Sequence, residues 1–248
     1  MLFRVILPLI FIGLWSSAFL AAKVGVQYSM PFAMLLVRFT LVSLVFAVML
    51  PFARIWRDTP PPRATRAVIG WTALVGITLH STYLGSVFFA LSLGLPAGIA
   101  ALIVSLQPLL ASGLAIFLFG ERLRAIQIGG MLAGLAGVVL VLLPKLGGDM
   151  PALGLASVCF GLCAVTFGTL LQKRIGGKID LLQGNLVQTL AASAFLAVIC
   201  LTVETPRIAW EMPFILSLAW QVVMVSAGAY VILMVLIQRD TMASVSSL

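Results

Sequence analysis

Charged residues are scarce in this chain of 248 residues, where they make up 9% of the sequence, against roughly a quarter in soluble domains. Hydrophobic residues reach 62%, and the mean hydropathy is +1.20. So little charge excludes a soluble globular protein, a disordered chain and a nucleic-acid-binding domain. The composition predicts an all-α protein that crosses a membrane several times, because a helix satisfies its own backbone hydrogen bonds in lipid.

Acidic residues, histidine and cysteine are rarer still, with seven, one and three copies. None of the acidic residues lies in an apolar run, and the sequence holds no paired carboxylates, metal-ligand cluster or phosphate-binding loop. Cys159, Cys163 and Cys200 all lie within apolar runs, where cysteine usually behaves as a small apolar residue. We therefore expect a protein that is not an enzyme and that uses neither a metal nor another cofactor.

Apolar runs of about 20 residues, the length that a helix needs to cross the hydrocarbon core, occur eight times. The first run is too long for a signal peptide and is followed by Lys23, so we interpret it as a retained helix. The predicted spans are residues 5–22, 31–50, 67–90, 96–119, 125–143, 152–171, 182–203 and 213–237.

The net charge of +8 indicates orientation in the membrane. If the N-terminus is cytoplasmic, the cytoplasmic gaps hold eleven Lys and Arg, and the opposite gaps hold three. Because positive loops stay inside, we predict a cytoplasmic N-terminus. We expect the lipid bilayer to be the chain's surroundings, and we expect no nucleic-acid partner.

The two halves of the chain are weakly similar. An offset of 150 residues aligns Lys23 with Lys173 and Arg38 with Gln188. A unit of five helices enters the membrane upside down when it is repeated, so equivalent loops should have opposite charge bias. The loop after the second span has four Arg, and its equivalent after the seventh has one. We predict an inverted repeat of five-helix units, with the first unit at 1–145 and the second at 150–248.

The second unit ends earlier than the first, which extends about 40 residues beyond the position equivalent to Leu248. We therefore expect a ten-helix protein, of which this chain holds eight full transmembrane helices and the start of a ninth. A natural eight-helix protein is the alternative.

Several motifs resemble the EamA family of the drug/metabolite transporter superfamily. They are Ser-Leu-x-Pro at 105–108, Gly-Glu-Arg at 120–122 and a Gly-rich run at 127–138. Residues 31–39 resemble that family's second helix, and residues 239–248 resemble the start of its ninth. The resemblance implies ten helices with both termini cytoplasmic and a central cavity between the repeats. It also implies carriage of small metabolites, often amino acids or their derivatives, and frequently outward.

Polar and aromatic residues inside the predicted spans are candidates for substrate binding, because polar groups are costly in a membrane. His80 lies roughly 20 Å into the third span and shares a helix face with Tyr83. Gln107 precedes a proline that interrupts the fourth span, and interrupted helices present backbone polar groups to substrates. The predicted substrate-binding residues are Trp15, Ser16, His80, Tyr83, Gln107 and Gln221.

Structural alternatives stay open for these side chains. His80 could make a structural hydrogen bond to a neighbouring helix, and Pro108 could mark a simple kink. We expect Arg38 to extend outward to the membrane surface rather than to bind an anion. Gly130 and Gly134 predict close packing of the fifth helix against its own repeat, with a second copy in a homodimer as the alternative.

Together these features predict a secondary transporter of the bacterial inner membrane. It would export small metabolites, such as amino acids or their derivatives, by alternating access. One alternative is a non-transporting membrane scaffold or assembly subunit. The other is a phosphate-linked metabolite carrier of the same superfamily, which would need several cations in its cavity, where the sequence offers only Arg38.

Overall fold

The structure is a computed structural model that describes residues 2–55, 64–119, 125–143 and 150–228. This part of the chain is helical, and its β pairing is limited to one bridge between Ser29 and Ile208. Helices occupy all eight predicted spans, and five of the eight are long and apolar enough to cross a membrane. The all-α membrane class is therefore confirmed. The predicted end of the eighth span and the start of the ninth helix lie outside the described residues.

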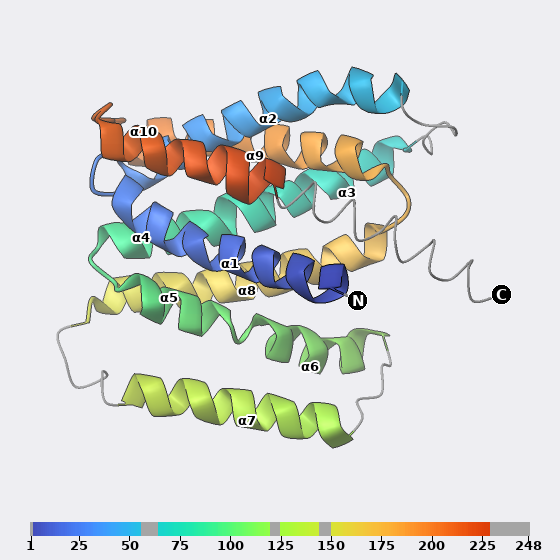
Figure 1. The fold of residues 1–248 in the computed structure, drawn as a ribbon, viewed down its shortest axis with the longest axis vertical. Coiled ribbons are helices and arrows are strands. Elements are labelled where there is room, and N and C mark those ends of the chain that lie inside the picture. The colour runs from blue at the N-terminus through green and yellow to red at the C-terminus, as the bar shows by residue number, and fades with distance from the viewer. Residues whose placement is uncertain (1, 56–63, 120–124, 144–149, 229–248) are drawn as a thin grey trace.

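The helices lie side by side in one bundle (Figure 1). Three of the spans are subdivided: the third into α3, η1 and α4, the fourth into α5 and α6, and the eighth into α10 and η3, where η marks a π-helical segment. In chain order the elements are α1 (Leu2–Gly25), α2 (Pro31–Ile55), α3 (Arg66–Gly76), η1 (Ile77–Tyr83), α4 (Leu84–Ser92), α5 (Ala97–Val104), α6 (Gln107–Phe119), α7 (Ala125–Leu142), α8 (Ala152–Ile175), α9 (Leu181–Val203), α10 (Met212–Ala219) and η3 (Trp220–Gly228).

The two π segments are marked by side chains that bond five residues back. The Thr82 hydroxyl donates to the carbonyl of Ile77 over 3.1 Å, and the Ser226 hydroxyl donates to that of Gln221 over 3.0 Å. This spacing matches the wider turn of a π-helix, which is rare and often lies at functional sites. Both segments begin near the middle of a span, where they change the direction in which the following side chains point.

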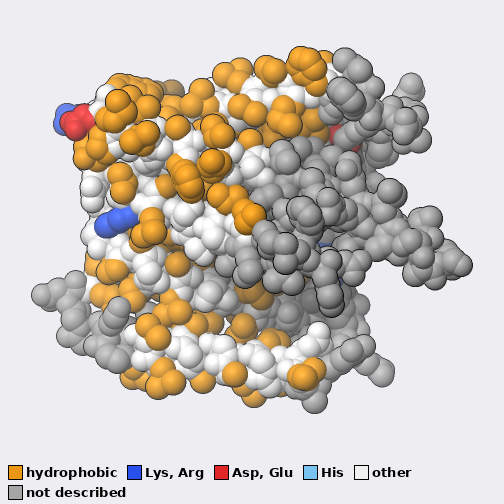
Figure 2. Space-filling view, in the orientation of Figure 1, with side chains coloured by type: hydrophobic (Ala, Val, Ile, Leu, Met, Phe, Trp, Pro, Cys, Tyr) orange, Lys and Arg blue, Asp and Glu red, His pale blue; other side chains and the backbone are white. Residues whose placement is uncertain are grey.

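Packing between the helices is closest where α2 lies against α9 and where the third span lies against α8 and α9. At Gly76, a Cβ atom would overlap the backbone of Gln188 on α9, so this contact needs glycine. Large side chains such as Phe88 and Phe214 are buried between the helices. Hydrophobic side chains also cover much of the described outer surface (Figure 2), as expected for a bundle that faces lipid.

The fifth predicted helix, α7, lies at the edge of the bundle next to α5 (Figure 1). Its glycine face was predicted to pack closely against the helix's own repeat. Among the described atoms, a Cβ on Gly129, Gly130 or Gly137 would meet nothing within 4 Å, and one on Gly134 would only touch Leu109. That part of the packing prediction is wrong for the described residues, because α7 contacts α5 at few points and leaves this face open.

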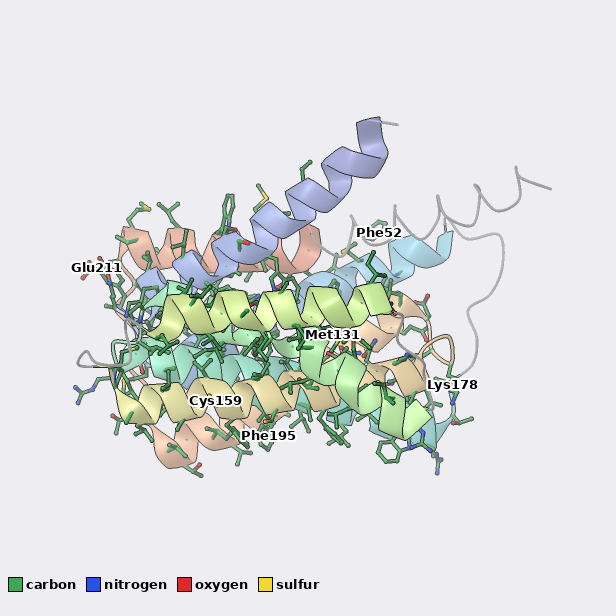
Figure 3. All side chains as sticks on the ribbon, turned by 90° about the horizontal axis from the view of Figure 1, so that it is seen from below. Phe52, Met131, Cys159, Lys178, Phe195 and Glu211 are labelled. Carbon is green, nitrogen blue, oxygen red and sulfur yellow. The ribbon has the colours of Figure 1, made fainter. Side chains whose placement is uncertain are left out.

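Two loops join at one end of the bundle. The amide of Met30 donates to the carbonyl of Arg207 over 3.0 Å, and that of Ala209 donates to the carbonyl of Tyr28 over 2.7 Å. The Glu204 carboxylate, at the end of α9, accepts from the first amides of α2. Lys178 lies at the opposite end of the bundle from Glu211 (Figure 3). The loop after the first span and the loop after the seventh span therefore share one end, as the predicted topology requires.

Candidate functional site: a central cavity

A cavity of about 440 Å³ lies between α1, α2, the third span, α6, α8, α9 and η3. Side chains from both halves of the chain therefore form its wall. The volume falls in the range of small-molecule sites, roughly 300–1,000 Å³. Most of the wall is apolar or aromatic. The lining residues are Trp15, Ala18, Phe19, Arg38, Phe39, Val42, Phe46, Leu79, His80, Tyr83, Leu84, Phe88, Gln107, Val165, Thr169, Asn185, Thr189, Val225 and Ser226.

Four of the six predicted substrate-binding residues line this cavity. They come from three different elements, α1, η1 and α6, and are Trp15, His80, Tyr83 and Gln107. Gln221 is fully buried beside the cavity, where it bonds Arg38. Ser16 is exposed and is not among the lining residues, because its neighbours Trp15 and Ala18 occupy the inward face of α1.

Arg38 points inward, so the predicted extension of its side chain to the membrane surface is wrong. The side chain is 5% exposed and lines the cavity. Its Nη1 donates to Gln221 Oε1 over 2.9 Å, and its Nη2 donates to Ser226 Oγ over 3.4 Å. Both acceptors lie on η3, about 185 residues away along the chain, and they hydrogen-bond the guanidinium inside the bundle.

One nitrogen of Arg38 is left without a partner. Its Nε is buried and makes no hydrogen bond. Both acceptors that it does have, an amide and a hydroxyl, are neutral, and the described residues place no acidic side chain in the cavity wall. The cavity therefore contains an uncompensated positive charge.

His80 lies on the other π segment, η1. Its ring packs on Phe39 with 4.9 Å between ring centroids, and Gln188 is its polar neighbour. The Nε2 atom is nevertheless buried and has no hydrogen-bond partner. The Gln188 amide donates to Gln172 Oε1 over 2.8 Å, so Gln188 has a second partner of its own. His80 therefore lines the cavity while one of its ring nitrogens is buried and unpaired.

The interruption of the fourth span lies where the proline predicts it. The helix α5 ends at Val104, a turn follows, and α6 begins at Gln107. Pro108 lacks a backbone donor and therefore cannot continue the hydrogen-bond ladder of α5. The break brings Gln107 to the cavity wall.

Sequence reasoning missed several polar and aromatic members of the wall. Asn185 and Thr189 lie one turn apart on α9, and Thr169 lies on α8. The four-residue spacing of Asn185 and Thr189 inside an apolar run was a usable signal. The phenylalanines carried no signal, because 15 are spread along the chain and the sequence does not say which of them face inward.

The fold defines a multi-pass helical membrane protein with a central cavity. Residues 2–143 match the EamA-like transporter family, part of the drug/metabolite transporter superfamily, and the chain belongs to that family. It is 26% identical to the uncharacterized transporter YvbV of Bacillus subtilis, over 94% of this chain and 75% of that protein.

Other relatives match over less of their length. The chain is 28% identical to a probable amino-acid metabolite efflux pump of Escherichia coli, over 60% of this chain and 46% of that protein. It is also 28% identical to the inner membrane transporter YedA of Escherichia coli, over 80% and 63%. A crystal structure superposes with a TM-score of 0.64 at 23% identity, covering 92% of this chain and 77% of that one, which supports the fold.

Proposed function

We propose that the protein is a secondary transporter that exports small metabolites across the bacterial inner membrane by alternating access. The observation that carries the proposal is the cavity, whose wall combines four predicted binding residues with side chains from both halves of the chain. In a transporter built from inverted repeats, the substrate site lies between the repeats near the middle of the membrane. Efflux pumps among the relatives support the outward direction.

The helix contacts support the inverted repeat, with units at 1–145 and 150–248. If the second unit repeats the first, then the first span corresponds to α8, α2 to α9, and the third span to the eighth. Equivalent helices make equivalent contacts. The helix α1 lies against α10 and η3 of the second unit, and its equivalent α8 lies against η1 and α4 of the first. The helix α2 packs against its own equivalent, α9. Both third helices of the units also contain a π segment.

The polar pairs of the core lie on corresponding elements of the two units. Arg38 and Gln188 are equivalent positions at an offset of 150 residues. Arg38, on α2, bonds Gln221 on the π segment of the second unit. Gln188, on α9, neighbours His80 on the π segment of the first unit. A polar contact between the second helix of one unit and the π segment of the other therefore lies on each side of the cavity.

Within this proposal, Trp15, His80, Tyr83 and Gln107 contact the substrate, and Gln221 orients Arg38. Ser16 has no part in it, because its side chain faces away from the cavity.

Cysteine labelling tests the proposal. In a variant without the three native cysteines, Gln107→Cys should react with a membrane-impermeant maleimide added from either side of the membrane, because alternating access brings water to this position from both. Leu110→Cys, one turn away on α6, 42% exposed and absent from the cavity wall, is the matched control and should stay unreactive in lipid. Equal, low reactivity at both positions would indicate a dry core and overturn the proposal.

A further inference from the structure

We propose that the cavity selects organic monocarboxylates that have an aromatic or aliphatic body and no free ammonium group, with Arg38 as the carboxylate receptor. This inference rests on the proposed transport function and specifies the chemical class that the cavity accepts.

The charge of Arg38 is the first argument. The guanidinium is buried at a cavity wall, with two neutral acceptors and an unpartnered Nε. An uncompensated charge is strongly unfavourable in an apolar interior, and an anion that enters the cavity reduces this cost. A carboxylate fits the planar fork of a guanidinium through two parallel hydrogen bonds, so it is the anion that this geometry favours.

The remaining wall determines the body of the ligand. Phe39, Phe46, Tyr83 and Phe88 present aromatic surface to a volume of about 440 Å³. Apolar groups of a ligand gain free energy when such surface removes them from water. A hydrophilic acid such as acetate would leave this surface unused, whereas an arylalkanoic acid would cover it.

An ammonium group has no anionic partner in this cavity. The described wall contains no Asp or Glu, and none of the predicted spans contains one. Arg38 would repel an ammonium across a medium of low dielectric constant. A phosphate dianion would bring more negative charge than a single guanidinium neutralises. A carboxylate without a free amine, including an N-acylated amino acid, therefore matches the cavity better than a zwitterionic amino acid.

Binding to the purified full chain in lipid nanodiscs tests the selectivity. The probes are 3-phenylpropionate, its amide, N-acetylphenylalanine, phenylalanine, phenethylamine and phenyl phosphate, compared by ligand-induced thermal stabilisation and by dissociation constants. We expect 3-phenylpropionate and N-acetylphenylalanine to bind about 10- to 100-fold more tightly than the other four, the factor that a lost hydrogen bond to a charged group produces. Equal or tighter binding of phenylalanine or phenethylamine would overturn the inference, as would equal binding of the amide.

Variants then assign the effect to Arg38. Arg38→Gln should lose the preference for the acid over the amide, and Arg38→Lys should keep part of it. Arg66→Gln, which removes an exposed arginine at the start of α3, is the control and should bind as the wild type does. If Arg38→Gln does not fold, the comparison of 3-phenylpropionate with its amide on the wild type still tests whether the cavity prefers a carboxylate. Maleimide labelling of the Gln107→Cys variant together with failure of every carboxylate would reject this selectivity and leave the transport proposal standing.

Discussion

Arg38 and His80 each leave one buried nitrogen without a hydrogen bond, in a part of the molecule where most polar side chains are satisfied locally. Thr72, Thr166 and Ser43, for comparison, donate to carbonyls of their own helices. Because unpaired polar atoms are costly in a membrane interior, these two side chains are candidates for interaction with a ligand. Both side chains line the same cavity, which connects their unpaired nitrogens to the proposed function.

A carboxylate in place of the Gln221 amide tests whether the positive charge of Arg38 is uncompensated. Gln221→Glu would put a negative charge where Oε1 now lies 2.9 Å from Arg38 Nη1. We expect a higher melting temperature, because the buried cation gains a counter-charge, and loss of stabilisation by 3-phenylpropionate, because that counter-charge competes with the ligand. Thermal unfolding with and without the ligand measures both.

The control at the same position is Gln221→Leu, which removes the acceptor. It should lower the free energy of unfolding by about 1.5–3 kcal/mol, typical of a hydrogen bond to a charged group. If the Glu and Leu variants lose equal stability, Arg38 is not the uncompensated charge that the structure indicates.

At the scale of the elements, every irregular span contributes side chains to the cavity wall. The third and eighth spans contain π segments, and the fourth is interrupted before Gln107. Residues of each irregular region, such as His80, Gln107 and Ser226, line the cavity, which fits the frequent occurrence of π segments at functional sites. The proline predicts the interruption of the fourth span. No single residue type indicates a π segment, and the sequence analysis predicted neither of the two π segments.

The contact between α3 and α9 gives a prediction about packing. Gly76→Ala should destabilise the protein by about 1–3 kcal/mol, because the added methyl group meets the rigid backbone of Gln188. Gly70→Ala, on the same helix with nothing within 4 Å, is the control and should change stability by less than about 1 kcal/mol. Thermal unfolding of the two variants measures the difference. Equal effects would contradict the close contact.

Glu204 gives a prediction about helix capping. Its carboxylate accepts from the amides of Phe32 and Ala33 over 3.3 and 3.1 Å and so caps α2 from the end of another helix. Glu204→Ala should cost about 1 kcal/mol, the usual value of a lost N-terminal cap. An unchanged melting temperature in that variant would show that water replaces the cap at no cost.

The same residue makes stability depend on pH. Burial raises the pKa of Glu204, and the two amides offset part of that rise. The folded state therefore favours the protonated carboxyl, so this contribution is complete below the ordinary pKa of 4.5 and is lost as the pH rises through the raised value. Relative to Glu204→Gln, the wild type should lose melting temperature as the pH rises above about 4.5. A difference that is constant between pH 4 and 7 would contradict this.

At the scale of the whole molecule, the helices present apolar surface outward and surround the central cavity. Leu140 and Leu201, at 70% and 75% exposure, are suited to lipid rather than to water. Connections alternate between the two ends of the bundle, with α1–α2, α4–α5 and α9–α10 at one end and α8–α9 at the other (Figure 1). This alternation is the arrangement that the charge count assumes.

Reporter fusions test the orientation. Alkaline phosphatase fused after Tyr28 should be active, because we predict that loop to be periplasmic, and green fluorescent protein fused after Gly177 should fluoresce, because that loop follows Lys173 and Arg174. The exchanged fusions are the controls and should be silent. The reverse pattern would place the N-terminus outside.

The sequence by itself determined the membrane class, the positions of the eight helical spans and the family. These follow from hydropathy, charge and local motifs, which report on the chain's immediate surroundings in lipid and water. It also singled out Trp15, His80, Tyr83 and Gln107, because His, Tyr and Trp are rare in this chain and polar side chains are costly in apolar spans. Only the tertiary structure decided that Arg38 points inward, that Ser16 points away and which phenylalanines line the cavity. Those outcomes depend on which helices become neighbours across more than a hundred residues, and on two π segments that rotate the faces of their helices.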